Sequence, residues 1–259
     1  MWNKRKSKAS GNREKEMSLS GHLREMRNRI LVCLVLLIAA ILVSLGYAER
    51  LVEFLLSIGR TYGYRFVYIA PQELLLQYFS VSLIAGVCVM LPVFFYQAWA
   101  FLRPGLKKSE NLFFIFAMIF GLICFCIGVC FANKIMLPFM LEFLISLSSG
   151  SSVSATVSVQ SYISFLMTVF MVFGFIFELP MVSVLLTQMG FLKVEWMKKG
   201  RKIVIVGIFF IAAVITPPDV VSQVMVAVPM LILYELSIIL CRICQRFRKI
   251  QKINHGKRE

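Results

Sequence analysis

Long apolar stretches separated by short charged segments dominate the chain. Six of them are poor in charge, and most are long enough to cross about 30 Å of hydrocarbon. They run over residues 30–47, 74–102, 112–133, 157–192, 203–215 and 220–241. The fifth stretch is short and only TPPD separates it from the sixth, so it must recruit flanking residues to span fully. The pattern predicts an all-α polytopic membrane protein with six transmembrane helices.

Lys and Arg residues gather on one side of this six-helix arrangement. Of the 28 basic residues, nine precede residue 30, three lie in 103–108, five in 193–202 and seven in 242–259. Only Arg50, Arg60, Arg65 and Lys134 fall on the other side. Because basic residues concentrate in cytoplasmic loops, both termini are predicted to be cytoplasmic. Topology and contact with anionic lipid then account for the net charge of +15, without a nucleic-acid partner.

Composition supports the same class of protein. The chain is 59% hydrophobic with a mean hydropathy of +0.81, and both values exceed those of a typical soluble domain.

We expect a disordered basic leader over residues 1–17, a transmembrane domain over 18–242 and a basic cytoplasmic tail over 243–259. The first apolar run exceeds a typical signal-peptide core and lacks a small-residue cleavage site, so it should remain in the mature chain. The Ser-rich stretch 146–161 should be an external loop.

Catalytic and metal-binding motifs are missing from the sequence. None of the seven cysteines lies in a predicted external loop, which argues against disulfide bonds. Cys241 and Cys244 have the spacing of a zinc-binding pair, but the sequence offers no second pair of ligands and has only two histidines. There is no H-E-x-x-H, no G-x-S-x-G and no Gly-rich phosphate loop. An intramembrane protease would also need a nucleophile and a base. We therefore expect neither an enzyme nor a bound cofactor or metal.

Glu178 is the notable acid, because it lies inside the predicted fourth span. A carboxylate at that depth costs at least about 2.5 kcal/mol, so it usually faces a cavity or a partner. Pro180 should interrupt the helix beside it, and Gly174, one turn earlier, should allow another helix to approach closely. Function at an interface and an internally paired structural acid are both open interpretations.

Three other acids each have a structural explanation. Glu25 lies four residues before Arg29, at ion-pair spacing on a helix. Glu110 follows Ser109, a plausible N-cap, and an acid in the first turn favours the helix dipole. Asp219 ends the TPPD segment, which is similar to a capping box.

Several motifs in order resemble the TatC family of twin-arginine protein translocases. They are GHLREMRNRI before the first span, PVFFYQAWAFLRPGLKKSE at the second span and its loop, FGFIFELP in the fourth, and ITPPDVVSQVMVAVPMLILYE at the final hairpin. The resemblance covers residues 18–242. It implies a cupped six-helix protein of the bacterial cytoplasmic membrane with both termini in the cytoplasm.

The resemblance also implies a function and partners. Members of this family bind twin-arginine signal peptides of folded proteins at the cytoplasmic face. They recruit single-span TatA-type or TatB-type proteins into an oligomeric complex, and the proton-motive force drives export. A proton-coupled small-molecule transporter with Glu178 as its proton carrier is the alternative, but it predicts inverted repeats that are not visible in the sequence.

Site residues follow from the matched motifs. Glu25 and Glu110 match the acids that recognise the signal peptide, and two carboxylates suit the two guanidinium groups of a paired arginine motif. The remaining expected site residues are His22, Arg27, Phe101, Pro104 and Leu106 around the signal peptide, and Glu178, Pro180, Gln223 and Asp219 at partner contacts. Two departures from the family pattern, the segment 49–51 and Asn133, concern the external cap.

Overall fold

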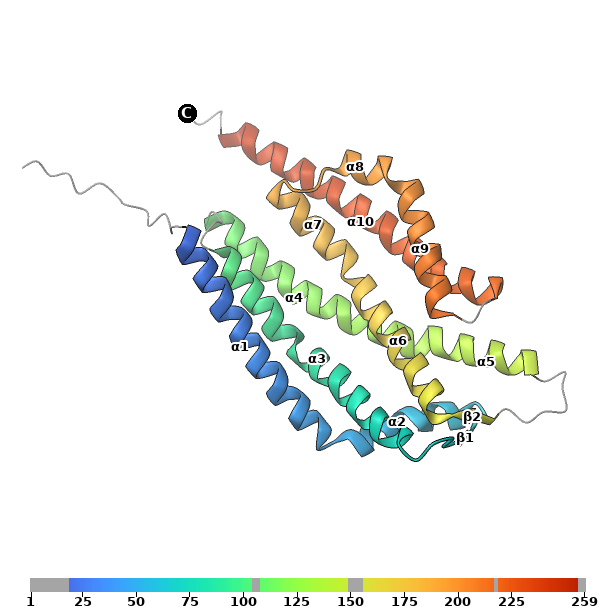
Figure 1. The fold of residues 1–259 in the computed structure, drawn as a ribbon. Coiled ribbons are helices and arrows are strands. Elements are labelled where there is room, and N and C mark those ends of the chain that lie inside the picture. The colour runs from blue at the N-terminus through green and yellow to red at the C-terminus, as the bar shows by residue number, and fades with distance from the viewer. Residues whose placement is uncertain (1–18, 104–107, 149–155, 217–218, 256–259) are drawn as a thin grey trace, which may run out of the picture.

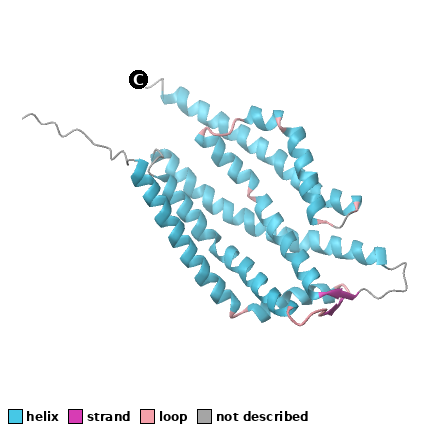
Figure 2. Cartoon of the chain, viewed as in Figure 1, coloured by secondary structure: helices cyan, strands magenta, loops and turns pink. Residues whose placement is uncertain are grey.

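The computed structural model describes residues 19–103, 108–148, 156–216 and 219–255, without the side chains of 19–22, 102, 108–110, 147–148 and 247–255. Helices make up nearly all of this part (Figures 1 and 2). In chain order the elements are α1 Leu19–Leu45, α2 Ala48–Thr61, β1 Arg65–Val67, α3 Glu73–Leu102, α4 Lys108–Phe131, η2 Ala132–Met136, α5 Leu137–Ser148, β2 Thr156–Ser158, α6 Val159–Phe177, α7 Leu179–Met189, α8 Val194–Lys199, α9 Arg201–Ile215 and α10 Val220–His255.

Five helical segments of the described chain are long and apolar enough to cross a membrane. They cover Leu23–Leu45, Glu73–Phe101, Asn111–Ser146, Val159–Met189 and Val220–Arg246. The all-α polytopic class is therefore confirmed. The helix α9 has 15 residues, which is about 22 Å, so the sixth span stays a prediction.

The external segments differ from the sequence-based expectation. The third span was expected to end at Asn133, but the π-helical segment η2 carries the helix on into α5, which ends at Ser148. An unpredicted amphipathic helix, α2, follows α1. The strands β1 and β2 form a parallel pair that joins Arg65 to Thr156, and each has three residues, too few for a recognisable alternating pattern. The expected loop 146–161 thus contains a strand and both flanking helix ends.

The predicted interruption in the fourth span is confirmed. The helix α6 ends at Phe177 and α7 begins at Leu179, with Glu178 between them and Pro180 at the start of α7. Proline has no N–H to donate and its ring crowds the preceding turn, so the helical ladder stops here. The break leaves Glu178 at the junction of two helices.

Small residues bring the helices close together. A Cβ built on Gly86 of α3 would lie 3.1 Å from the Cα of Ile41 in α1. On the other side of the bundle, a Cβ on Gly174 of α6 would lie 2.6 Å from the ring of Phe125 in α4. Close backbone approach through glycine is the usual packing mode of membrane helices, where burial in lipid gives little driving force. The neighbour that Gly174 admits is therefore α4 of the same chain.

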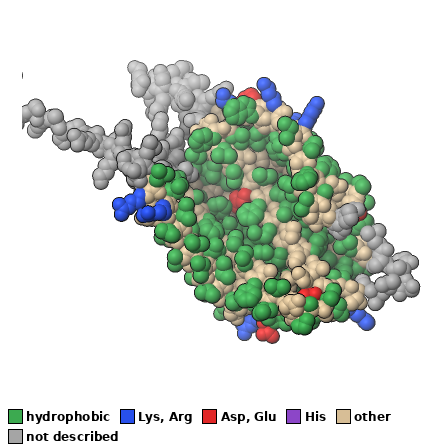
Figure 3. Space-filling view, in the orientation of Figure 1, with side chains coloured by type: hydrophobic (Ala, Val, Ile, Leu, Met, Phe, Trp, Pro, Cys, Tyr) green, Lys and Arg blue, Asp and Glu red, His purple; other side chains and the backbone are tan. Residues whose placement is uncertain are grey.

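One end of the bundle carries α2, β1 and β2 (Figure 1). The charge pattern of the sequence predicts that this end lies outside the cell, so we call it the outer end. Here the Tyr64 hydroxyl donates to the Leu141 carbonyl over 3.2 Å, and the rings of Phe66 and Tyr162 lie 4.7 Å apart. Burial raises the pKa of the Tyr64 hydroxyl. Tyrosine favours the boundary between lipid and water, so Tyr64 and Tyr162 are expected to lie near the outer membrane interface. Between the two ends, hydrophobic side chains cover most of the face shown in Figure 3.

Candidate functional site

Glu25 lies on the first turns of α1 and is paired within its own helix. The Arg29 guanidinium donates to Glu25 Oε1 from Nε at 3.0 Å and from the terminal nitrogen NH2 at 2.5 Å. Both side chains are only partly exposed, 26% for Arg29 and 23% for Glu25. The ion pair expected from their spacing is confirmed, and it is more sheltered than an ordinary surface pair.

The same guanidinium also reaches a second helix. Arg29 donates to Gln97 Oε1 over 3.0 Å and to the Ala100 carbonyl oxygen over 3.1 Å, both in the last turns of α3. Arg29 therefore ties α1 to α3 at the end predicted to be cytoplasmic, which we call the cytoplasmic end. The acceptors from Glu25, Gln97 and Ala100 together form a cradle for one guanidinium, which we call the guanidinium cradle.

The beginning of α4 lies at the same end of the bundle (Figure 1). The indole N–H of Trp99 donates to Asn111 Oδ1 over 2.9 Å, which joins the end of α3 to the first turns of α4. Glu110 precedes Asn111 directly, in the first turn of α4 as expected. However, α4 begins at Lys108, so Ser109 lies inside the helix and the N-cap expected there is wrong. The segments of Glu25 and Glu110 therefore both adjoin the end of α3.

The other residues expected around the signal peptide fall into two groups. Arg27 is exposed on α1, and Phe101 is half-buried at the end of α3. Pro104 and Leu106 lie outside the described residues, and the side chains of His22 and Glu110 are outside the description as well.

Glu178 is a buried acid without a partner in the described chain. Its side chain is 7% exposed, and neither carboxyl oxygen has a hydrogen-bond partner among the described residues. A buried polar group that is left unsatisfied costs about 1–3 kcal/mol. The internally paired interpretation of this acid is therefore wrong for the described part of the chain.

Gly121 on α4 gives the Glu178 carboxyl its room. A Cβ built on Gly121 would lie 3.0 Å from Glu178 Oε2, closer than about nine in ten real Cβ contacts. The carboxyl oxygen thus packs against the backbone of α4 beside the break in the fourth span. This position was not recognised from the sequence, although a glycine within an apolar helix is a signal for close approach.

Asp219 and Gln223 make local contacts in the final hairpin. Asp219 Oδ1 accepts from the Ser222 backbone N–H over 2.7 Å, which makes Asp219 itself the N-cap of α10. The structural role expected for Asp219 is confirmed, but the capping box expected over TPPD is wrong, because Thr216 is the C-cap of α9 and its N–H bonds to the Ala212 carbonyl oxygen. That N–H holds the pKa of the Asp219 carboxyl below its ordinary value. Gln223 Nε2 donates to the Phe209 carbonyl oxygen over 3.0 Å, which links α10 to α9. Neither residue joins the cytoplasmic site or Glu178.

Comparison with known proteins gives consistent matches. The family described as Sec-independent protein translocase protein (TatC) matches residues 21–229. A protein named Sec-independent protein translocase protein TatC from Desulforapulum autotrophicum is 37% identical over 89% of this chain and 87% of its own. TatCy from Bacillus subtilis is 29% identical over 94% of this chain and 95% of its own.

A solved structure is similar over nearly its whole length. The crystal structure titled twin arginine translocase receptor TatC superposes with a TM-score of 0.78 at 32% sequence identity. The match covers 86% of this chain and 99% of that one. The similarity therefore extends to the arrangement of the helices.

Proposed function

Because the chain belongs to the TatC family of Sec-independent protein translocase proteins, we propose that it binds twin-arginine signal peptides at its cytoplasmic end and recruits single-span TatA-type or TatB-type partners. The family resemblance recognised in the sequence is confirmed. The chain is a multi-pass integral protein of the bacterial membrane and a component of twin-arginine translocation, not an enzyme. Membership of this family favours protein export over the small-molecule transporter.

The guanidinium cradle is the observation that supports signal-peptide binding. One carboxylate oxygen, one amide oxygen and one carbonyl oxygen already hold the guanidinium of Arg29 at 2.5 to 3.1 Å. Acceptors with this geometry suit a planar fork of N–H donors, and a carboxylate makes such bonds stronger. An arginine of the ligand can share Glu25 with Arg29, while Glu110 in the first turn of α4 takes the second arginine. Each ligand arginine then has one carboxylate to accept its hydrogen bonds.

Glu178 is proposed to meet a polar side chain of the partner helix. Its carboxyl is buried at a break between two apolar helices and has no partner in the described chain. A donor on a neighbouring membrane helix would satisfy it, and the unmet bond favours association. Export itself is proposed to draw on the proton-motive force, since no nucleotide-binding motif is present in the sequence.

Binding of a signal peptide to purified variants tests the cytoplasmic site. Glu25→Ala and Glu110→Ala should each weaken binding by roughly ten- to a hundredfold, because a charge-assisted hydrogen bond contributes about 1.5–3 kcal/mol. Replacing one ligand arginine by lysine should cost less than replacing it by glutamine, since lysine keeps the charge and loses the fork. The measurement is the Kd of a labelled peptide at fixed ionic strength.

Glu195→Ala is the matched control, because Glu195 is an exposed acid on α8 in another predicted cytoplasmic segment. It changes the net charge equally and should leave the Kd unchanged. If all three variants weaken peptide binding equally, the effect of the two acids is explained by net charge alone. If Glu25→Ala and Glu110→Ala both bind like the parent, the two acids have only structural roles.

A further inference from the structure

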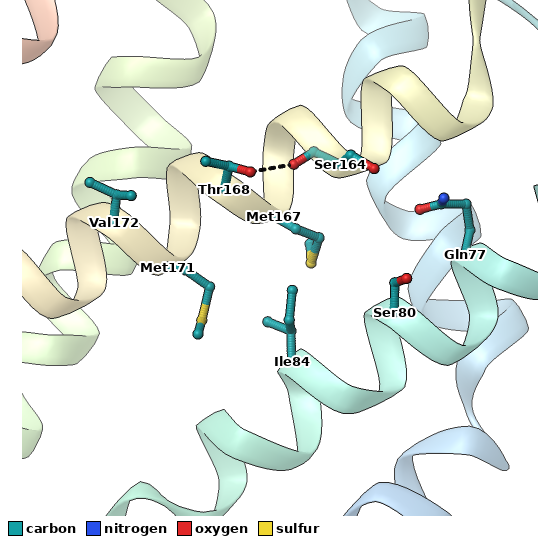
Figure 4. A pocket seen from close by; sticks show the side chains of 8 residues that line it. All are labelled: Gln77, Ser80, Ile84, Ser164, Met167, Thr168, Met171 and Val172. Atoms are coloured by element: carbon teal, nitrogen blue, oxygen red, sulfur yellow. Dashed lines mark hydrogen bonds between the residues drawn. The ribbon is translucent and has the colours of Figure 1, made fainter. Parts of the chain in front are cut away.

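A cavity of about 360 Å³ lies between α3 and α6, near the outer end (Figure 4). Its lining comes from both helices: Gln77, Ser80 and Ile84 of α3, and Ser164, Met167, Thr168, Met171 and Val172 of α6. None of these residues belongs to the guanidinium cradle or contacts Glu178. The proposed function therefore leaves this cavity without a role.

The cavity changes character with depth. Gln77 and Ser80 lie four and seven residues into α3, and Ser164 lies five residues into α6, so they sit about 6–11 Å from the outer helix ends. Ile84, Met171 and Val172 lie about 16–20 Å in. Apart from Thr168, which lies between these two levels, the polar lining is thus near the outer helix ends and the apolar lining is deeper.

Gln77 has a buried amide oxygen that lacks a hydrogen-bond donor among the described residues. Its side chain is 3% exposed. Figure 4 shows Gln77 and Ser164 on facing sides of the cavity. A buried carbonyl of this kind needs a donor, and lipid acyl chains cannot supply one. An occupant with an N–H or O–H group at this depth would satisfy the Gln77 oxygen.

We propose that this cavity is a binding site for a phospholipid with an ethanolamine headgroup in the outer leaflet. The ammonium N–H of ethanolamine suits the Gln77 oxygen, and the exposed hydroxyls of Ser80 and Ser164 can donate to the phosphate. The lining holds no Lys or Arg, which favours a zwitterionic headgroup over an anionic one. Below them, Met167 and Met171 offer flexible, apolar side chains to one acyl chain.

Native mass spectrometry of the purified full chain tests this site. The probes are phosphatidylethanolamine, phosphatidylcholine and phosphatidylglycerol with identical acyl chains. Phosphatidylcholine is the matched ligand, because its trimethylated nitrogen has no N–H to donate. We expect at least threefold more bound phosphatidylethanolamine than either of the others. Equal retention of all three lipids would overturn the proposal.

Gln77→Leu separates binding from folding. The variant removes an acceptor that makes no hydrogen bond, so its Tm without added lipid should be unchanged or higher. The preference for phosphatidylethanolamine should nevertheless disappear. Gln160→Leu, at an exposed amide on the first turn of α6 outside the cavity, should keep the preference. A preference that survives in Gln77→Leu would contradict the assignment.

A photocrosslinking side chain at position 80 identifies the occupant in membranes. Lipid adducts are expected there. Adducts with a protein partner in place of lipid would overturn the proposal and assign the cavity to a membrane helix. This outcome would leave signal-peptide binding by Glu25 and Glu110 unaffected, because those acids lie at the opposite end of the bundle.

Discussion

Two acids of this chain, Glu25 and Glu178, face opposite conditions. Glu25 lies at the cytoplasmic end and is held by two hydrogen bonds from Arg29. Glu178 lies between two membrane helices and has no partner in the described chain. Glu25 is partly exposed at the end of the bundle, where a ligand from the water can reach it. Glu178 is buried between membrane helices, where another membrane segment can reach it.

The paired state of Glu25 and the unpaired state of Glu178 have different consequences for binding. The proposed ligand at Glu25 would enter a cradle whose geometry is already set by Arg29, so pre-organisation would lower the cost of binding. The proposed partner at Glu178 would instead satisfy the buried carboxyl, so association itself would supply the missing bond. We therefore expect substitutions at the cytoplasmic site to affect both folding and binding, and those at the membrane site to affect association alone.

The largest expected effect on stability comes from Arg29→Gln. This variant removes the bonds to Glu25, Gln97 and Ala100, so the free energy of unfolding should fall by about 1.5–3 kcal/mol. Arg29→Lys should be intermediate, since it keeps the charge and loses the fork. Thermal unfolding in detergent measures both changes.

Arg60→Gln is the control for this prediction. Arg60 pairs with Glu53 on α2 at 2.5 Å, but both side chains are more than half exposed. Water screens such a pair, so its loss should change stability by less than about 1 kcal/mol. Equal losses in Arg29→Gln and Arg60→Gln would show that the guanidinium cradle is no stronger than a surface ion pair.

Glu178→Leu should separate association from folding. Leucine fills a similar volume without an unsatisfied oxygen, so thermal stability should be retained or raised. Crosslinking to the single-span partner should fall about tenfold, the equivalent of one hydrogen bond of about 1.4 kcal/mol. Glu178→Gln can still hydrogen-bond and should keep most of the crosslinking. Normal crosslinking and export in the leucine variant would show that the acid is merely tolerated.

Much of this arrangement could be predicted from the sequence because the relevant signals are local. The apolar runs, the break at Pro180 and the pairing of Glu25 with Arg29 each depend on residues a few positions apart. The guanidinium cradle could not be predicted in full, because Gln97 and Ala100 lie on another helix. Gly121 escaped recognition for the same reason, since its role depends on how α4 packs against the break.

The external segments were harder to predict. The polar residues Asn133 and Lys134 looked like the end of a span, yet they lie within η2, where backbone hydrogen bonding continues through the π-helical turn. The strands β1 and β2 are stabilised by their mutual pairing across a long stretch of chain. Neither feature has a periodic pattern of its own.

Gly121→Ala should weaken the partner contact more mildly than Glu178→Leu. The new methyl group would lie 3.0 Å from Glu178 Oε2, so the carboxyl must shift by a few tenths of an ångström. We expect crosslinking to fall about two- to fivefold, which is roughly 0.4–1 kcal/mol. Gly207→Ala on α9 is the matched control, because a Cβ there meets no atom within 4 Å. Equal crosslinking in both variants would contradict a positioning role for Gly121.

Asp219 is expected to give the smallest effect, because it serves its own helix. Asp219→Asn can still cap α10 and should unfold like the parent, whereas Asp219→Ala should lower the Tm slightly. Neither variant should change crosslinking to the partner. Lost crosslinking at unchanged Tm would instead make Asp219 a partner contact like Glu178.

The pH dependence of the Asp219→Ala effect checks this cap independently. The Ser222 N–H lowers the pKa of the folded-state carboxyl below its unfolded value of about 4. The cap's contribution is therefore fully present above the unfolded pKa and is lost as the pH falls through the folded pKa. The Tm difference between parent and Asp219→Ala should be constant at neutral pH and shrink in acid. The Asp219→Asn variant has no titrating group here, so its difference from Asp219→Ala should not shrink. A parent-to-alanine difference that grows in acid would contradict the capping role.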